Sequence, residues 1–193
     1  MQVPALCSRC GAEHIAEVPQ SVNAAMQPEL KERVRSGTLF TWSCPHCGTI
    51  NLLKVPFLYH DPSERLMIVL TEAPVSAEGV PDGYTGRQVR SVGDLIEKIK
   101  IFDAGLDDLI IEMCKFVTCR ELKKDVPLKF VGTDGADGEM TFTYPDKGQM
   151  EMVAVGFNVY EDCAGILQRN PYVRDSIRGL ATIDQAWLTR FFR

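Results

Sequence analysis

Apolar and polar residues alternate along several short segments of the first half of the chain, and this alternation predicts β-strands. The pattern is found at residues 12–19, 39–43 and 48–55. Between the first two segments, residues 28–37 have a helical pattern, because Leu30 and Val34 lie four positions apart on one face. Pro28 suits the first turn of a helix and Gly37 suits its end, so we expect a helix inserted between the strands.

Residues 57–71 predict two more strands, joined by a turn at Asp61, Pro62 and Ser63. Since successive strand side chains point to opposite faces, Leu66, Ile68 and Leu70 are expected on the buried face. We expect this strand pair to continue the sheet of the preceding segments. Residues 72–86 are rich in Gly, Pro and Ala, which is typical of a loop.

Two consecutive helices are expected at 91–105 and 106–124, forming a helical hairpin. Ser91 and Asp94 have a spacing that resembles a capping box, and Gly105 suits the end of the first helix. Apolar residues at helical spacing predict the buried face of the second helix; they are Leu106, Leu109, Ile110, Met113 and Val117.

The remaining residues predict a three-stranded meander followed by helices. The strands are expected at 126–133, 139–145 and 150–156, with Met140, Met150 and Met152 in the core. Asn158 is the expected cap of the next helix and Thr182 the expected cap of the last. The fold class is therefore α+β. We expect a zinc-binding domain at 1–125, and a small α+β appendage at 126–193 that either stands apart or shares the same core.

Composition narrows the class of protein. The chain has 193 residues, of which 45% are hydrophobic and 24% charged, enough for a buried core. Its apolar runs are much shorter than the roughly 20 residues that cross a bilayer, and no signal peptide is recognisable, so we expect a cytoplasmic protein. The net charge of -5 argues against nucleic-acid binding, although the last 25 residues contain more Arg than Asp.

The seven cysteines carry the most specific chemical signal in the sequence. An odd number without an export signal favours reduced thiols or metal ligands over a disulfide framework. Four of them form two C-x2-C-G knuckles, which predict a tetrahedral zinc site; they are Cys7, Cys10, Cys44 and Cys47. Gly11 and Gly48 follow the knuckles, where the chain must turn sharply and a positive φ is expected.

The tetrapeptide "CPHC" at 44–47 also occurs in oxidising thioredoxin-class enzymes, so a redox dithiol is the alternative. Such a dithiol needs the N-terminus of a helix to lower its pKa, whereas the residues after Cys47 predict a strand. Histidines 14 and 46 lie near the knuckles, but four sulfurs complete the site without them. The remaining thiols are expected to be inert and to pack as small apolar groups; they are Cys114, Cys119 and Cys163.

Tyr59, His60 and Asp61 form the one compact polar cluster that is suited to acid–base chemistry. Consecutive strand residues point to opposite faces, however, and an Asp before Pro62 is typical of a turn. We therefore predict that these residues serve packing and that none of them is catalytic.

Several blocks, in this order, resemble the CpXC family of prokaryotic proteins: "CSRCG", "PELKERVRSGTLFTWSCPHCG", "VPFLYHDPSERLMI" and "KIKIFDAGLDD". The resemblance covers about residues 5–125. It implies a zinc-binding domain of unestablished function, with Cys7, Cys10, Cys44 and Cys47 as the family's cysteines. It implies no reaction.

The sequence thus predicts a zinc-stabilised, non-enzymatic binding or regulatory module with structural zinc and a partner that is expected to be a protein. The alternatives are a thiol oxidoreductase that uses Cys44 and Cys47, or a nucleic-acid-binding zinc-ribbon protein. Common nucleotide-binding and hydrolase motifs do not occur in the sequence. No substrate and no oligomeric state follow from the sequence.

Overall fold

A computed structural model of the chain describes residues 1–76, 79–134 and 138–192. The chain forms two compact units, Met1–Ile96 and Glu97–Arg193. This division falls inside a helix, whereas the sequence pattern divides the chain after residue 125; where independently folding domains begin and end stays a prediction. Within the described ranges, every helix is too short or too polar to span a bilayer.

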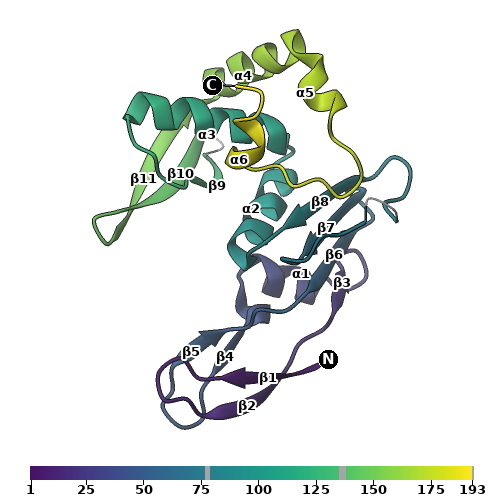
Figure 1. Cartoon of the computed structure of the whole chain (residues 1–193), viewed down its shortest axis with the longest axis vertical. Coiled ribbons are helices and arrows are strands. Elements are labelled where there is room, and N and C mark those ends of the chain that lie inside the picture. Colours follow the sequence, from purple (N-terminus) through teal and green to yellow (C-terminus); the bar gives the residue numbers. More distant parts are fainter. Residues whose placement is uncertain (77–78, 135–137, 193) are drawn as a thin grey trace. The chain divides into compact units, whose positions relative to one another are not determined.

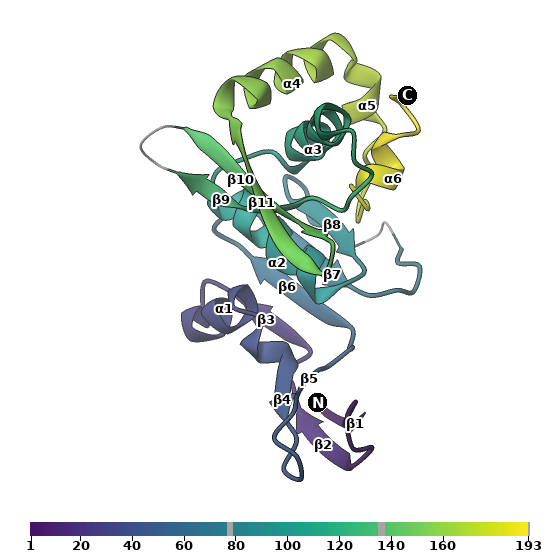
Figure 2. The same ribbon diagram turned by 90° about the vertical axis from the view of Figure 1, so that its left-hand side faces the viewer.

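The first unit begins with two small antiparallel hairpins, which carry the cysteine knuckles at their turns. The first pairs β1 (Gln2–Leu6) with β2 (Glu13–Glu17), and the second pairs β4 (Thr41–Ser43) with β5 (Ile50–Leu52). Figure 2 shows the two hairpins next to each other. The sequence pattern predicted β2, β4 and β5 but not β1.

The segment between the hairpins contains the inserted helix that the sequence predicts. It comprises β3 (Ser21–Asn23), α1 (Pro28–Arg35) and a 3₁₀ helix at Thr38–Phe40. Pro28 lies in the first turn of α1 and Val34 is fully buried. Gly37 ends the helix with a φ of 76°, a conformation that favours glycine. Part of the predicted strand at 39–43 is therefore helical.

A four-stranded sheet forms the rest of the first unit, in the order β3-β6-β7-β8 (Figure 1). It contains β6 (Phe57–Asp61), β7 (Leu66–Leu70) and β8 (Thr85–Val89), and Leu66, Ile68 and Leu70 are buried as predicted. The expected continuation from the second hairpin is wrong, because β6 pairs in parallel with β3. Pro56 lacks the N–H group that a continuous ladder needs.

Strand β8 begins in the segment that was assigned to a loop. It pairs in parallel with β7, and its burial does not alternate because the adjacent Gly86 and Arg87 are both buried. Alternation with a period of two indicates a strand with one solvated face, so this strand could not be predicted from alternation. The loop before β8 ends at residue 84 instead of the expected 86. Residues 77–78 lie outside the described ranges.

Two consecutive helices are present as predicted, α2 (Val92–Asp103) and α3 (Asp108–Leu122). Ser91 Oγ accepts a hydrogen bond from the Asp94 amide at 3.1 Å and contacts the Asp94 carboxylate at 2.6 Å, as the capping spacing predicts. Gly105 follows α2 with a φ of 68°. Asp107 caps α3 by accepting a hydrogen bond from Leu109 N at 2.9 Å.

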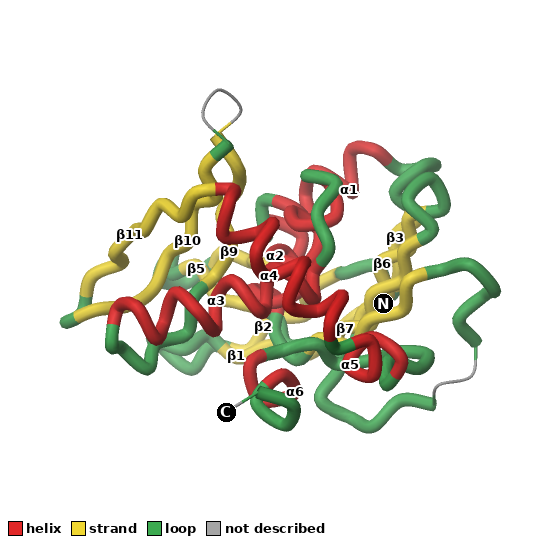
Figure 3. The backbone as a smooth tube through the Cα atoms, turned by 90° about the horizontal axis from the view of Figure 1, so that it is seen from above, coloured by secondary structure: helices red, strands yellow, loops and turns green. Residues whose placement is uncertain are grey.

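The three-stranded meander of the second unit has the order β11-β10-β9, which Figure 3 shows. Its strands are β9 (Lys129–Asp134), β10 (Glu139–Asp146) and β11 (Gln149–Gly156). Met140 is fully buried, but Met150 and Met152 are 62% and 67% exposed, so their predicted place in the core is wrong. They alternate with Val153 and Val155, which pair with the buried part of β10, and therefore point to the other face. Between β9 and β10 the sequence pattern is typical of a hairpin turn, and residues 135–137 of that segment lie outside the described residues.

Three helices complete the second unit: α4 (Phe157–Arg169), α5 (Pro171–Asp175) and α6 (Gln185–Leu188). Figure 2 shows α3 beside α4 and α6. Two predicted caps are wrong: Gly156, not Asn158, precedes α4, and Asp184, not Thr182, caps α6. Asp184 accepts a hydrogen bond from Trp187 N at 2.7 Å. Helix α5 was not predicted.

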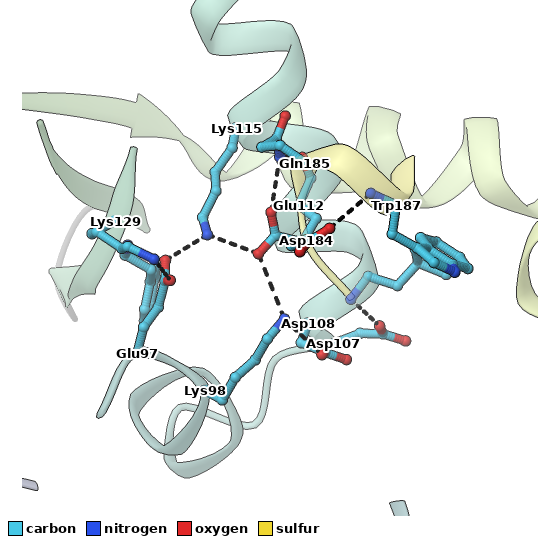
Figure 4. A network of polar contacts seen from close by, with 12 residues as sticks. Glu97, Lys98, Asp107, Asp108, Glu112, Lys115, Lys129, Asp184, Gln185 and Trp187 are labelled. Carbon is cyan, nitrogen blue, oxygen red and sulfur yellow. Dashed lines mark hydrogen bonds and ion pairs between the residues drawn. The ribbon is translucent and has the colours of Figure 1, made fainter. Parts of the chain in front are cut away.

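A chain of alternating charges lies inside the second unit (Figure 4). Each member forms an ion pair with the next at 2.6–3.5 Å, in the order Lys129, Glu97, Lys115, Glu112, Lys98 and Asp108. All except Lys129 are buried. Gln185 of α6 donates to the Glu112 carboxylate at 2.8 Å, and Glu97 accepts from Phe130 N at 2.7 Å. Buried ions of this kind need such partners, because they have lost their hydration.

Candidate metal centre

The two cysteine knuckles have the same local hydrogen bonding. In the first, Gly11 N donates to the Cys7 carbonyl at 2.9 Å; in the second, Gly48 N donates to the Cys44 carbonyl at 2.8 Å. The glycines have φ angles of 69° and 70°, as the sequence predicts. Because the two turns have the same hydrogen bond and the same glycine conformation, each knuckle directs its two sulfurs toward one point.

A contact between two aromatic rings brings the two hairpins and their knuckles together. The rings of His14 on β2 and Trp42 on β4 are stacked, with centroids 4.8 Å apart and planes inclined by 17°. Trp42 is buried between the hairpins. The stacking gives His14 a packing role, and His46 lies exposed in the second knuckle, so the four sulfurs form the cluster without a histidine.

Asn51 joins the two knuckles directly, and sequence reasoning did not identify it. Its Oδ1 atom accepts hydrogen bonds from both Ser8 N and Ser8 Oγ at 2.8 Å, and its Nδ2 atom donates to the Thr49 carbonyl at 2.9 Å. The same amide lies 3.7 Å from Cys7 Sγ. The available signal was a polar side chain at an inward position of a short alternating strand, where an apolar residue is expected.

The four knuckle sulfurs lie within 4.8 Å of one another. Cys7 Sγ is 3.5 Å from Cys47 Sγ, and Cys10 Sγ is 3.7 Å from Cys44 Sγ. These distances are much longer than a disulfide bond of about 2.05 Å, but they are close to the roughly 3.8 Å edge of a tetrahedron with metal–sulfur bonds of about 2.3 Å. The thiols therefore fit the donor set of a tetrahedral metal ion.

The protonation of the thiols differs across the cluster. The backbone hydrogen bond from Cys10 lowers the pKa of Cys7 to about 6, against the effect of burial. A backbone hydrogen bond from Ala12 lowers the pKa of Cys10, but contacts with Cys47 and other thiols, together with burial, outweigh it and raise the value to about 12. Four adjacent thiolates repel one another, so a nearby cation is needed to deprotonate all of them.

The other three cysteines belong to the second unit and are not members of the cluster. Cys114 and Cys163 are buried, and Cys119 Sγ donates to the Val126 carbonyl at 3.4 Å. The burial of Cys114 agrees with its predicted packing role.

Asp61, from the "LYHD" segment, is the centre of a turn and an ion pair. Its Oδ2 atom lies 2.9 Å from Lys31 Nζ and accepts from the Tyr59 hydroxyl at 3.3 Å, while Oδ1 accepts from Ser63 N at 3.1 Å. Burial raises the pKa of Asp61, but the Lys31 ammonium and the hydrogen bonds outweigh it, and the pKa is lowered. The carboxylate thus ties α1 to the turn after β6.

His60 points to the other face of β6 from Tyr59, as the strand alternation predicts. Its ring lies 5.6 Å from that of Tyr84, whereas Tyr59 is almost fully buried. The three residues therefore do not converge on one point, and this geometry favours the predicted packing role.

Comparison with known proteins gives one match. No curated protein and no solved structure matches the chain. The family model described as CpXC protein matches residues 5–115, which is more than half of the chain and includes all four clustered cysteines. The chain belongs to the CpXC family.

Proposed function

We propose that the chain is a zinc-stabilised binding or regulatory module and that the zinc is structural. The observation that carries this proposal is the cluster of Cys7, Cys10, Cys44 and Cys47, with all sulfurs within 4.8 Å. Four thiolates are a donor set that suits zinc, and a tetrahedral four-sulfur site has no open coordination position for a substrate. The ion would therefore hold the two hairpins together and take no part in a reaction.

The position of the second knuckle supports this role over a thiol oxidoreductase. Cys44 and Cys47 lie in the turn between β4 and β5, so no helix N-terminus is available there to activate a thiolate. Cys44 Sγ lies 3.7 Å from Cys10 Sγ and Cys47 Sγ lies 3.5 Å from Cys7 Sγ, so each sulfur of the second knuckle contacts one of the first. A redox dithiol would be expected to pair Cys44 with Cys47.

Metal content and thiol reactivity test the proposal. Protein purified without added metal is expected to contain about one zinc per chain. Cys44→Ser should lose the metal, and the matched control Cys119→Ser should keep it. Cys10 is exposed, yet it should resist alkylation until a chelator is added, because a metal-bound thiolate is a poor nucleophile.

A metal content near zero, or rapid alkylation of Cys10 without a chelator, would contradict the zinc site. Reduction of a disulfide substrate by the metal-free protein, lost in Cys47→Ser, would instead support the oxidoreductase.

We further propose that the partner is a protein which contacts the outer faces of the two hairpins. Leu6 and Ile15 are 67% and 63% exposed on the first hairpin, and Ile50 and Leu52 are 72% and 54% exposed on the second. Exposed apolar side chains in a group are typical of protein interaction surfaces.

Comparison of variants tests this surface. A partner captured by the wild-type chain should be lost with Ile50→Asp and retained with Met150→Asp, which changes an exposed apolar residue of the other unit. Equal capture by both variants would exclude the hairpin surface, and salt-sensitive capture of nucleic acid would favour the nucleic-acid alternative.

A further inference from the structure

A groove of about 520 Å³ lies in the first unit and begins at the second hairpin. Its lining residues come from the segment that follows β5, from the end of β7 with the residues after it, and from the start of α2. All of them belong to Met1–Ile96, so one compact unit forms the groove. Its volume lies in the range of about 300–1,000 Å³ that is typical of ligand sites.

The groove is mainly apolar. Leu53, Val55, Leu70 and Val92 line it and are buried in the core of the unit. Leu52 also lines it, but this side chain is 54% exposed and belongs to the outer face of the second hairpin. The groove and the hairpin face therefore form one apolar surface. An apolar side chain that enters the groove leaves water, which favours binding.

Two basic side chains at the groove have no acidic partner. Lys54 and Arg90 line it, and both are exposed. Within residues 1–76, 79–134 and 138–192, neither side chain forms an ion pair or a hydrogen bond, whereas Lys31 of the same unit pairs with Asp61 at 2.9 Å. Glu72 is the acidic residue among those that line the groove. The lining is thus more basic than acidic in a chain with a net charge of -5.

The backbone beside the groove also has free hydrogen-bonding groups. Residues 53–56 connect β5 to β6 and pair with no described strand. Leu53 N donates to the Phe40 carbonyl at 2.7 Å. Over the described part of the chain, no hydrogen bond involves the backbone of Lys54 or Val55. Unpaired backbone groups of this kind form hydrogen bonds with an added peptide strand.

We propose that the groove binds a segment of a protein partner in which an apolar side chain lies next to acidic residues. The apolar side chain enters the groove, and the carboxylates pair with Lys54 and Arg90. The backbone of the partner forms hydrogen bonds with the free groups of residues 54 and 55. This inference rests on the proposed role as a protein-binding module, and it gives the chemistry of the partner.

The continuity of the surface favours a protein segment over a small apolar acid. A small acid fills the groove but leaves the exposed Leu52 and Ile50 in water, whereas a protein segment covers both regions. A small acid also lacks the successive N–H and C=O groups that match a free backbone. Charge at the rim acts mainly on the rate of association and on its dependence on salt.

Selection from a phage-displayed library of random heptapeptides on the full, zinc-containing chain tests the proposal. The enriched sequences should share Asp or Glu beside Leu, Ile, Val or Phe. A synthetic peptide of the enriched sequence should bind about tenfold more weakly to the double variant Lys54→Glu, Arg90→Glu, and more weakly at high salt. Arg33→Glu reverses an exposed charge on α1 of the same unit and should leave its affinity unchanged.

The variants replace exposed side chains, so unchanged zinc content and thermal unfolding should show that they fold. No enriched sequence, enrichment of basic sequences, or equal affinity for the double variant would overturn the groove proposal. Binding of decanoate without any peptide would overturn it too, as would self-association of the wild type that the double variant loses.

Ile50→Asp separates this inference from the proposed function, because Ile50 lies on the hairpin face and does not line the groove. Peptides that Ile50→Asp loses and the double variant keeps would overturn the groove proposal and leave the hairpin surface as the binding site. Peptides that the double variant loses and Ile50→Asp keeps would support the groove.

Discussion

The cysteine cluster of the first unit and the charge chain of the second both hold polar groups close together, but they balance charge differently. In the charge chain, three carboxylates alternate with three lysine ammonium groups at 2.6–3.5 Å. In the cysteine cluster, the described contacts of the sulfurs are with other thiols, Asn51 and Thr49. The charge chain contains its own counter-charges, whereas the cysteine cluster consists of sulfur atoms that can donate electron pairs to a metal ion.

This difference indicates what each region needs to be stable. The charge chain is complete within the polypeptide, and it lies in a unit with a large apolar core. The hairpins are short, and the exposure pattern of β1 and β4 shows little buried surface. Such two-stranded elements are marginal alone. The cluster is therefore expected to depend on an added cation, whereas the second unit depends on its own side chains.

Removal of the metal is expected to have the largest effect and would test this comparison most directly. Structural zinc binding contributes about 10–16 kcal/mol in small domains, comparable to the roughly 5–15 kcal/mol by which whole proteins are stable. Chelation should therefore expose the amides of residues 5–60 to hydrogen exchange first, while the core around Leu109 and Phe142 stays protected. Native-like exchange at 5–60 in the metal-free protein would contradict a structural role.

Breaking the charge chain is expected to have the next largest effect. Glu112→Gln leaves Lys98 and Lys115 with an uncompensated positive charge in a buried site, and breaking a buried pair costs about 3–5 kcal/mol. Urea unfolding of the second unit should report this loss. Glu121→Gln makes the same change at an exposed position of the same helix and should alter stability by less than about 0.5 kcal/mol. Equal effects of the two substitutions would show that the charge chain does not stabilise the second unit.

The ion pair of Asp61 predicts a smaller, pH-dependent effect. Because its pKa is lowered in the folded state, its contribution to stability is complete above the unfolded pKa of about 4 and is lost as the pH falls toward the folded pKa. Asp61→Asn should therefore be less stable near neutral pH and should lose less stability between neutral pH and about pH 3. The exposed Asp82→Asn serves as the control. An unchanged acid dependence in Asp61→Asn would contradict the assignment.

The exposed methionines of β11 predict the smallest effect. Met152→Thr removes a side chain that is 67% exposed, so the free energy of unfolding should change by less than about 0.5 kcal/mol. Truncation of the fully buried Met140 to Ala should cost about 2–5 kcal/mol in the same assay. A large loss in Met152→Thr would mean that another chain covers this face in solution.

Features that depend on neighbouring residues were predictable from the sequence. The knuckle pair follows from C-x2-C-G spacing, and the ends of α2 follow from Ser91, Asp94 and Gly105. The two consecutive helices α2 and α3 follow from apolar spacing. Each incorrect prediction has a specific cause. Met150 and Met152 were placed in the core because they are apolar, but they lie on the solvent face of an alternating strand. Strand β8 was missed because Gly86 and Arg87 are both buried, so its burial does not alternate.

The sequence alone determined the family resemblance, the α+β class and which four thiols share the knuckle pattern, since periodicity and ligand spacing are local properties. The tertiary structure decided the pairing of β3 with β6, the link from Asn51 to Ser8 and the charge chain. Each of these joins positions far apart in the chain. Many residues have the same local pattern as the true partners, and only packing of the whole chain selects which two meet.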